Sequence, residues 1–194
     1  MFKLLVATNN EKKVAEYRIL FKGYNITLYS LNDLNIKSDP DETGNSYKEN
    51  AAIKVKNVMQ FSKLPVISDD SGIEVDALGG RMPGIFSHRY VERFGTQEKA
   101  NGYLASFYSG SRATFNCAIA LGNVEDDIVY FSSQIVGSIV EPRGNDNFGY
   151  DPIFLPQNSL KTYAEMSSNE KNTLSHRAKA CFELINYLKD KKLI

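Results

Sequence analysis

The chain has 194 residues, which is enough for one domain, or one domain with a subdomain, around a sizeable core. Its 23 Lys and Arg residues balance its 23 Asp and Glu residues, and this neutral charge argues against a general nucleic-acid-binding protein. The amino terminus is too short for a signal peptide, and no apolar run approaches the ~20 residues that span a bilayer, so we expect a cytoplasmic protein. Cys117 and Cys181 lie among apolar residues and are predicted to be reduced core residues, with a disulfide as the less favoured alternative.

The first half of the chain is predicted to form parallel β-α units. An apolar strand over residues 2–7 leads into a helix, and a second strand follows over residues 26–31. An acidic loop over residues 38–44 precedes a further helix, whose start is marked by Ser46 and Glu49 in the pattern of a capping box.

The second half is predicted to be more antiparallel. Glycine and proline residues predict a loop over residues 72–84, and a helix follows over residues 97–108. Two longer strands, 113–121 and 128–140, are expected to pair in antiparallel fashion. The last helix begins near Asn169. Its apolar face comprises Leu174, Ala178, Cys181, Ile185 and Leu188. Together the elements predict an α/β fold with a mixed central sheet and flanking helices.

The most unusual stretch is the apolar strand Leu64–Ser68, which is followed by Asp69, Asp70, Ser71 and Gly72. Adjacent carboxylates at the edge of a core repel each other and resist desolvation unless a cation or hydrogen-bond donors hold them. The carboxyl ends of strands are also where open α/β sheets bind their ligands. We therefore predict metal-assisted chemistry at this strand end, with Gly72 in a tight turn.

The segment Thr8–Lys13 marks a sharp turn from the first strand into the first helix. Such a turn points backbone N–H groups and the positive end of the helix dipole outward. Thr8 and Asn10 add donors, and Lys13 lies one turn into the helix, so the segment predicts a phosphate-binding loop. The alternative is ordinary helix capping by Asn10 with the lysines in solvent.

A second set of acids, Asp39, Asp41 and Glu42, lies in the loop before the next helix. Mg²⁺ takes one or two protein carboxylates together with phosphate oxygens and waters. This loop is predicted to supply those carboxylates together with Asp69 and Asp70. The alternative is a solvated loop whose charge favours the N-terminus of the helix.

The loop Arg143–Pro152 contains Phe148 next to Gly149. The glycine spacing is not that of a dinucleotide-binding fingerprint. An aromatic ring beside a glycine in a loop is well placed to stack on a flat ring of a ligand. The alternative is a hairpin loop whose phenylalanine packs into the core.

The segment Glu170–Arg177 concentrates hydrogen-bond donors near the start of the last helix. Lys171, His176 and Arg177 lie within seven residues, and His176 is about half a turn away from the predicted apolar face. This cluster suits a phosphate or the edge of a purine, and the alternative is a solvated helix face. Arg89 offers a further phosphate contact, with a structural role as its alternative.

Five motifs, in their order and spacing, resemble the inosine triphosphate pyrophosphatase family, also described as non-standard purine nucleotide (dITP/XTP) pyrophosphatases. They are Thr8-x-Asn10-x-x-Lys13, Glu49-Asn50-Ala51, Asp69-Asp70-Ser71-Gly72, Phe148-Gly149-Tyr150-Asp151-Pro152 and Ser175-His176-Arg177. The resemblance implies that residues 1–194 form a single nucleotide pyrophosphatase domain with an active-site cleft between two lobes. It also implies a homodimeric, Mg²⁺-dependent hydrolase that cleanses the nucleotide pool, converting ITP, dITP or XTP to the monophosphate and pyrophosphate.

The resemblance also assigns site residues. Asp70 matches a metal ligand and proton acceptor, Asp41 a second metal ligand and Ser71 a substrate contact. The remaining substrate-binding positions fall on Thr8, Asn9, Asn10, Glu11, Lys12 and Lys13 for the phosphates, and on Phe148, Gly149, Tyr150, Asp151, Lys171, His176 and Arg177 for the nucleoside. The sequence departs from the family pattern at Asn9, where glycine is usual, at Asp41, where glutamate is usual, and at His88, where alanine is more frequent.

In the predicted mechanism, Mg²⁺ bridges the triphosphate, and Asp70, or Asp69 beside it, activates water for in-line attack at the α-phosphorus. Lys13 neutralises the pyrophosphate leaving group, and His176 with Arg177 donates to the 6-oxo group of the base. Two alternatives stay open: a pyrophosphatase for modified pyrimidine nucleotides, and a nucleotide-binding regulator without turnover.

Overall fold

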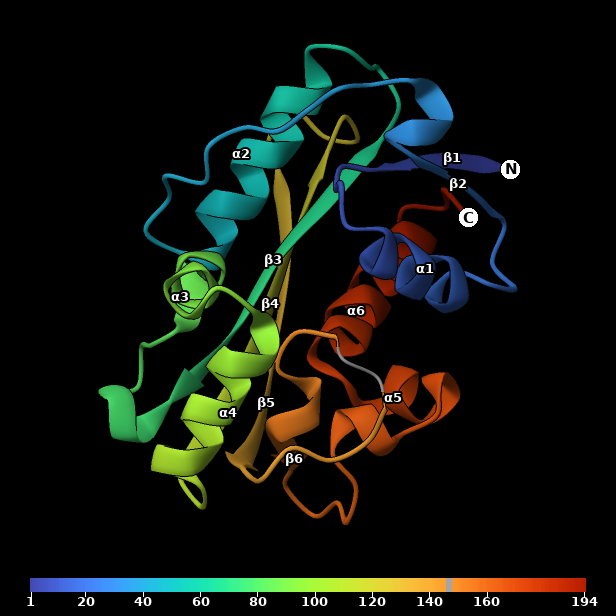
Figure 1. Cartoon of the computed structure of the whole chain (residues 1–194). Helices are drawn as coiled ribbons and strands as arrows, with labels where there is room; N and C mark the ends of the chain where they lie inside the picture. Colours follow the sequence, from blue (N-terminus) through green and yellow to red (C-terminus); the bar gives the residue numbers. More distant parts are fainter. Residues whose placement is uncertain (146–147) are drawn as a thin grey trace. The chain divides into compact units, whose positions relative to one another are not determined.

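The computed structural model describes residues 1–145 and 148–194, so residues 146 and 147 of the predicted loop lie outside the described part of the chain. Its contacts divide the chain into two compact units. The first comprises residues 1–70, 117–133 and 177–194, and the second comprises residues 71–116 and 134–176. The six strands follow the order β2-β1-β3-β4-β5-β6 in one sheet, and β3, β4 and β5 each run from one unit into the other (Figure 1). Within the described residues, no helix has the length and apolar character needed to cross a membrane.

The elements of the first unit are β1 (Phe2–Val6), α1 (Glu11–Leu20), β2 (Ile26–Ser30), α2 (Tyr47–Met59) and most of α6 (His176–Asp190). Those of the second are α3 (Ser87–Phe94), α4 (Gln97–Tyr108), β6 (Phe154–Pro156) and α5 (Ser168–Leu174). The strands shared by the units are β3 (Val66–Val75), β4 (Arg112–Gly122) and β5 (Val129–Ile139). The mixed α/β prediction is therefore confirmed, and the helix predicted over residues 97–108 matches α4.

Parallel pairing organises the first unit, as predicted. β1 pairs with β2 in the register Leu4 to Leu28, and with β3 in the register Leu5 to Val66. Parallel neighbours need a crossover connection, and α1 and α2 supply it.

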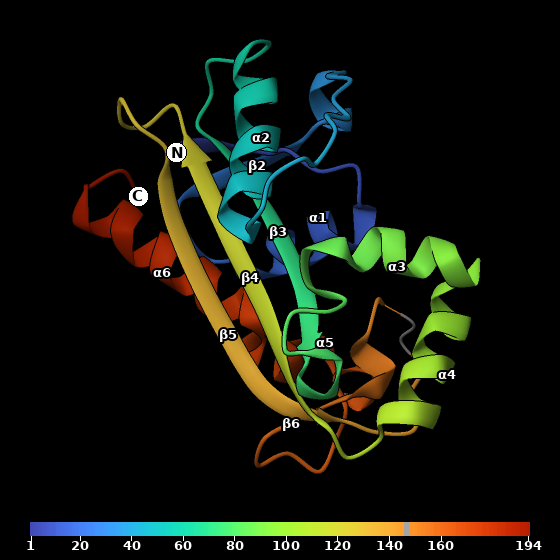
Figure 2. The same cartoon turned by 90° about the vertical axis from the view of Figure 1, so that its left-hand side faces the viewer.

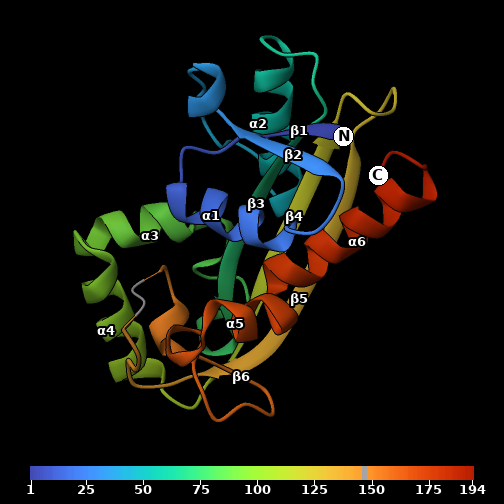
Figure 3. The ribbon, with the colours of Figure 1, turned by 90° about the vertical axis from the view of Figure 1, so that its right-hand side faces the viewer.

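The two faces of β1 carry two separate hydrophobic clusters, because successive side chains of a strand point to opposite sides. Leu4 and Val6 join a cluster with α1 and α6, whereas Leu5 joins a cluster with α2. Figure 2 looks onto the face that α2 covers, and Figure 3 looks onto the face that α1 and α6 cover. Burying each such side chain contributes about 1.5–3 kcal/mol to stability.

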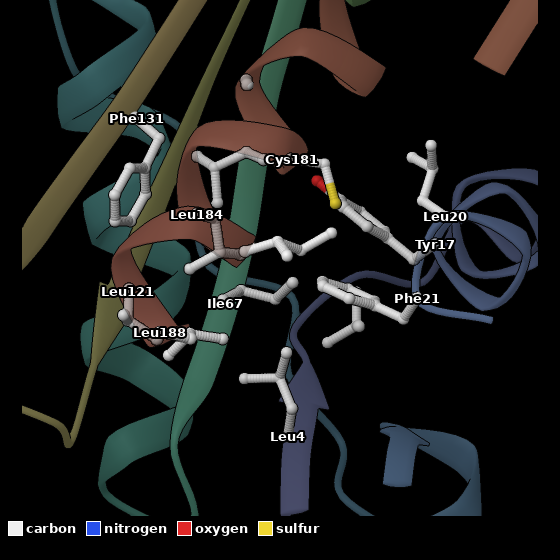
Figure 4. Close-up of a cluster of buried hydrophobic side chains, with 14 of the residues drawn as sticks. Leu4, Tyr17, Leu20, Phe21, Ile67, Leu121, Phe131, Cys181, Leu184 and Leu188 are labelled. Atoms are coloured by element: carbon white, nitrogen blue, oxygen red, sulfur yellow. The ribbon is translucent and has the colours of Figure 1, made fainter. Parts of the chain in front are cut away.

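Figure 4 shows the cluster under α1 and α6, in which Leu4 and Ile67 from the strands lie close to Leu184 and Leu188 of α6. Cys181 belongs to the same cluster. Both cysteines are buried and neither forms a disulfide, so their predicted place in the core is confirmed.

The second unit has an aromatic core of its own. Phe115 meets Phe154 edge-on, with ring centroids 5.2 Å apart, and Tyr163 lies 5.9 Å from Phe115. Such pairs add about 0.5–1.5 kcal/mol beyond the area that they bury. β5 and β6 pair in antiparallel fashion, with Ile139 opposite Phe154.

The predicted end of the Asp69–Asp70 strand was wrong. β3 continues through both carboxylates as far as Val75, and Gly72 lies inside the strand rather than in a turn. A Cβ at Gly72 would sit 2.3 Å from the Gly84 carbonyl oxygen, so this glycine permits a close backbone approach. Isolated glycine in a strand was mistaken for the start of a loop.

The last helix is two helices. Ser175 adopts an extended conformation with ψ 158° between α5 and α6, so Leu174 does not share a helix with Ala178. Leu174 packs against the core of the second unit, while Ala178 lies in the core of the first. Sequence periodicity also missed α3, because its eight residues, 87–94, are too few for an apolar pattern to repeat over several turns.

Candidate functional site

The strand geometry of β3 separates the two adjacent carboxylates. Side chains two residues apart share a face, so Asp69 lies on the face of Ile67 and Asp70 lies on the face of Val66. The contacts agree with this arrangement. Lys13 and Arg177 donate hydrogen bonds to Asp69, whereas Asn50 of α2 donates a hydrogen bond to Asp70. The predicted repulsion between neighbours is thus relieved by the pleat of the strand.

Asp69 lies at the centre of a buried ion network in the first unit. Its Oδ2 accepts from Lys13 Nζ at 2.9 Å and from Arg177 Nη2 at 3.2 Å. Arg177 Nη1 also forms a short contact with Glu16. Burial alone would raise the pKa of Asp69, but Lys13 and Arg177 outweigh it and hold this pKa well below its usual range. Asp69 is therefore ionised at neutral pH and fixes both cations.

Asp70 has the opposite character. It is 7% exposed, and burial raises its pKa above the usual range despite the nearby Lys54 and Lys13. The charge of Glu42 raises it further, while a hydrogen bond from Asn50 Nδ2 at 3.0 Å works in the other direction. A buried carboxylate whose ionised form is disfavoured is suited to binding a cation or accepting a proton.

The predicted phosphate loop forms the start of α1. Asn10 caps the helix, its Oδ1 accepting from Lys12 N at 3.0 Å and Lys13 N at 3.2 Å, and Thr8 Oγ1 accepts from Asn10 N at 3.2 Å. Capping is thus confirmed, but Lys13 does not extend into solvent, because it reaches Asp69. Exposed Asn9 donates from Nδ2 to the Ser38 carbonyl at 2.8 Å.

Glu11, also exposed, accepts a hydrogen bond from Asn32 Nδ2 at its Oε1, at a distance of 2.7 Å. Lys12 is exposed as well. Both residues therefore lie on the solvent side of the loop.

The acidic loop brings Glu42 rather than Asp41 into contact with α2. Glu42 Oε1 lies 2.7 Å from Lys54 Nζ, and its charge acts on Asp70. Glu42 and Asp41 are both exposed. The assignment of Asp41 as a metal ligand stays a prediction. Sequence reasoning missed Lys54 and gave no role to Asn50, which it named only as part of the motif Glu49-Asn50-Ala51. The spacing of four residues on a helix is a signal that Asn50 and Lys54 share a face.

The carboxylates of Asp70 and Glu42 have the chemistry that a divalent cation needs. Among the described residues, no three His, Cys, Asp or Glu side chains form a group that would hold a metal alone. Mg²⁺ needs no such group when phosphate oxygens and waters complete its shell. Asp70, a buried carboxylate with a raised pKa, together with Glu42, fits that requirement.

The second unit contains the predicted nucleoside residues except Arg177, which belongs to the first unit. Lys171 is buried, with Nζ 2.5 Å from Asp151 Oδ2 and 4.8 Å from the centroid of the Phe148 ring. His176 is also buried and stacks on Phe115, with centroids 4.1 Å apart and planes 9° apart. The alternative of a solvated helix face is therefore wrong for this segment.

Three further predicted residues, Tyr150, Gly149 and Ser71, also belong to the second unit. Tyr150 is buried and donates to the Ser87 carbonyl at 3.3 Å, and the Gly149 carbonyl accepts from Asn101 at 2.9 Å. Ser71 is half-buried. His88, in contrast, is exposed, with Nδ1 3.6 Å from Glu92.

Arg89 is exposed too, and its guanidinium carbon lies 5.6 Å from the centroid of the Phe86 ring. This contact within one short segment gives it a structural partner.

Comparisons with known proteins agree with the sequence motifs. A model of the Ham1 family matches residues 4–187. The chain is 38% identical to the dITP/XTP pyrophosphatase of Thermoanaerobacter pseudethanolicus over 192 residues, covering 96% of each chain. It is 39% identical to the dITP/XTP pyrophosphatase of Halalkalibacterium halodurans over 194 residues, covering 97% of this chain and 100% of that protein. The solved structure of a HAM1 protein from Coxiella burnetii has a TM-score of 0.84 to this chain at 32% identity, covering 98% of this chain and 100% of that one.

Proposed function

Because the chain belongs to the Ham1 family, we propose that it hydrolyses non-standard purine nucleoside triphosphates to the monophosphate and pyrophosphate. The observation that carries this proposal is Asp70, a buried carboxylate of raised pKa with Lys54 and Lys13 nearby. One carboxylate beside two cations suits a polyanionic substrate whose hydrolysis needs a proton acceptor.

We assign the divalent cation to Asp70 and Glu42, and we take the cation to be Mg²⁺. When bound, the cation neutralises phosphate charge and makes the α-phosphorus more electrophilic. Glu42 is preferred to Asp41 because its carboxylate is already held by Lys54, at 2.7 Å.

The chain's own groups account for the rest of the phosphate chemistry. Asp70 orients a water molecule and accepts its proton, since burial raises the pKa of Asp70 above its usual range. Lys54 and Lys13 offset the charge on the phosphates and on the leaving pyrophosphate. Asp69 is given no proton-transfer role, because its low pKa makes it a poor base. It acts by holding Lys13.

We assign the base to the second unit. Phe148 offers a ring for stacking, and His176 offers a donor for the 6-oxo group of hypoxanthine or xanthine. An adenine amino group would oppose that donor, at a cost of about 1–3 kcal/mol, or about 5–150-fold in selectivity. Arg177 was predicted to share this role, but its contacts with Asp69 and Glu16 favour a positioning role instead.

Steady-state assays of pyrophosphate release test the proposal directly. The wild type is expected to hydrolyse ITP, dITP and XTP well above ATP, to lose activity with EDTA and to regain it with Mg²⁺. Asp70→Asn is expected to reduce kcat at least 100-fold. Preferred turnover of modified pyrimidine nucleotides, or ITP binding without pyrophosphate release, would replace the proposal by one of its two alternatives.

The predicted homodimer and cytoplasmic location stay proposals. The homodimer rests on the family resemblance, and the location rests on the composition of the sequence. Sedimentation velocity at micromolar concentration tests the first, and fractionation of cells tests the second.

A further inference from the structure

Helix α2 holds the acidic loop along one of its faces. Positions 50, 54 and 57 follow the i, i+4, i+7 spacing that places side chains on the same side of a helix. The contacts are Asn50 Oδ1 with Gly44 N at 2.8 Å, Lys54 Nζ with Glu42 Oε1 at 2.7 Å, and Asn57 Oδ1 with Ser38 Oγ at 2.8 Å. The loop therefore runs antiparallel to α2 and is attached to it at three points.

Asn50 differs from the other two because it also reaches Asp70. It is 1% exposed, and its Nδ2 donates to Asp70 Oδ2 at 3.0 Å. The backbone N–H of Gly44 can only donate, so it must face the oxygen of the Asn50 amide. The amide nitrogen then faces the Asp70 carboxylate, and both ends of this buried side chain are used.

Gly44 is what allows the loop backbone to come so close. A Cβ added there would lie 2.7 Å from Asn50 Oδ1 and 2.7 Å from Glu49 Cβ. Asn50 itself is held by its place in the first turn of α2, where its backbone N–H donates to the carbonyl of the N-cap residue Ser46 at 3.1 Å. The missing Cβ of Gly44 and the fixed position of Asn50 in α2 therefore allow the loop backbone to contact the helix here.

We propose that Asn50 is a positioning residue that fixes the Asp70 carboxylate and the acidic loop relative to each other, so that Asp70 and Glu42 are held ready for a divalent cation. The role rests on the proposed function, since it concerns the same cation. Side chains that orient metal ligands typically change metal affinity or activity by about 10–100-fold when they are removed.

Three variants test the role: Asn50→Ala, Asn50→Asp and, as a matched control, Asn57→Ala. The first removes both hydrogen bonds, whereas the second keeps an acceptor for Gly44 N and removes the donor to Asp70. The control removes an attachment of the same loop to the same helix without touching Asp70. Each variant is measured for Mn²⁺ affinity by EPR without nucleotide, for kcat and KM with ITP and Mg²⁺, and for its thermal midpoint.

We expect Asn50→Ala to weaken Mn²⁺ binding about tenfold and to lower kcat at least tenfold, with KM for ITP changed less than threefold. Asn50→Asp is expected to lower kcat similarly, and Asn57→Ala to stay within twofold of the wild type. A folded Asn50→Asp protein with wild-type kcat would overturn the proposal, and so would Asn57→Ala matching Asn50→Ala. If wild type fails to hydrolyse ITP, the proposed function fails, while the Mn²⁺ affinities still decide the role of Asn50.

Discussion

Replacing Asp69 or Asp70 by asparagine should affect stability in opposite ways, although the two residues are neighbours. Asp69 is fully buried and compensates Lys13 and Arg177, of which Arg177 is 3% exposed at its side chain. Removing one partner of a buried ion pair leaves an uncompensated charge and costs about 3–5 kcal/mol. For a chain of this size that corresponds to a fall in Tm of about 6–20 °C.

Asp70→Asn should leave the free energy of unfolding at pH 7 unchanged or increase it by about 1 kcal/mol. The raised pKa of Asp70 means that its ionised form is less favourable in the folded than in the unfolded chain, so a neutral side chain relieves that cost. Asparagine also keeps an acceptor for the hydrogen bond from Asn50. Asp70→Asn is therefore expected to lose activity without losing stability.

The contribution of Asp69 to stability depends on pH. Its folded pKa is lowered, so its contribution is complete above the unfolded aspartate pKa, about 3.9, and is lost as the pH falls from there through the folded pKa. The stability difference between wild type and Asp69→Asn should therefore be constant from pH 7 to about pH 5 and shrink below ~3.9.

Urea unfolding followed by circular dichroism measures these differences across pH. Asp127→Asn is the matched control, because it removes the same charge from an exposed loop and should change stability by less than about 0.5 kcal/mol. Two results would contradict these opposite roles: an Asp69→Asn protein as stable as the wild type at pH 7, or an Asp70→Asn protein less stable than Asp69→Asn.

Two further predictions concern the second unit. Gly72→Ala should destabilise the protein by about 1–3 kcal/mol, because its Cβ would meet the Gly84 carbonyl oxygen at 2.3 Å. Gly102→Ala, in the middle of α4 with nothing within 4 Å of the added Cβ, should stabilise it by about 0.5–1 kcal/mol, and equal effects in thermal unfolding would contradict the close-approach argument. His176→Phe keeps a ring to stack on Phe115 at 4.1 Å, so Tm should change by less than about 4 °C, while the ratio of kcat/KM for ITP over ATP should fall about tenfold. An unchanged ratio would remove His176 from base selection.

The sequence by itself determined the local elements and the chemical composition of the site. The apolar run of residues 2–7, rich in Leu and Val, was enough to predict a buried strand, and the pattern of residues 97–108 was enough to predict α4. Asn10 and Ser46 marked helix starts because capping depends on residues close in sequence. The spacing of five motifs was enough to indicate the family.

Only the tertiary structure decided which charges meet. Asp69 and Asp70 are adjacent in sequence, but the pleat of β3 places one against α1 and α6 and the other against α2. Burial and partners then drive their pKa values in opposite directions. The contact of Glu42 with Lys54 depends on the path of a loop that no periodicity predicts. Contacts between residues far apart in sequence arise from packing, and local patterns carry no information about them.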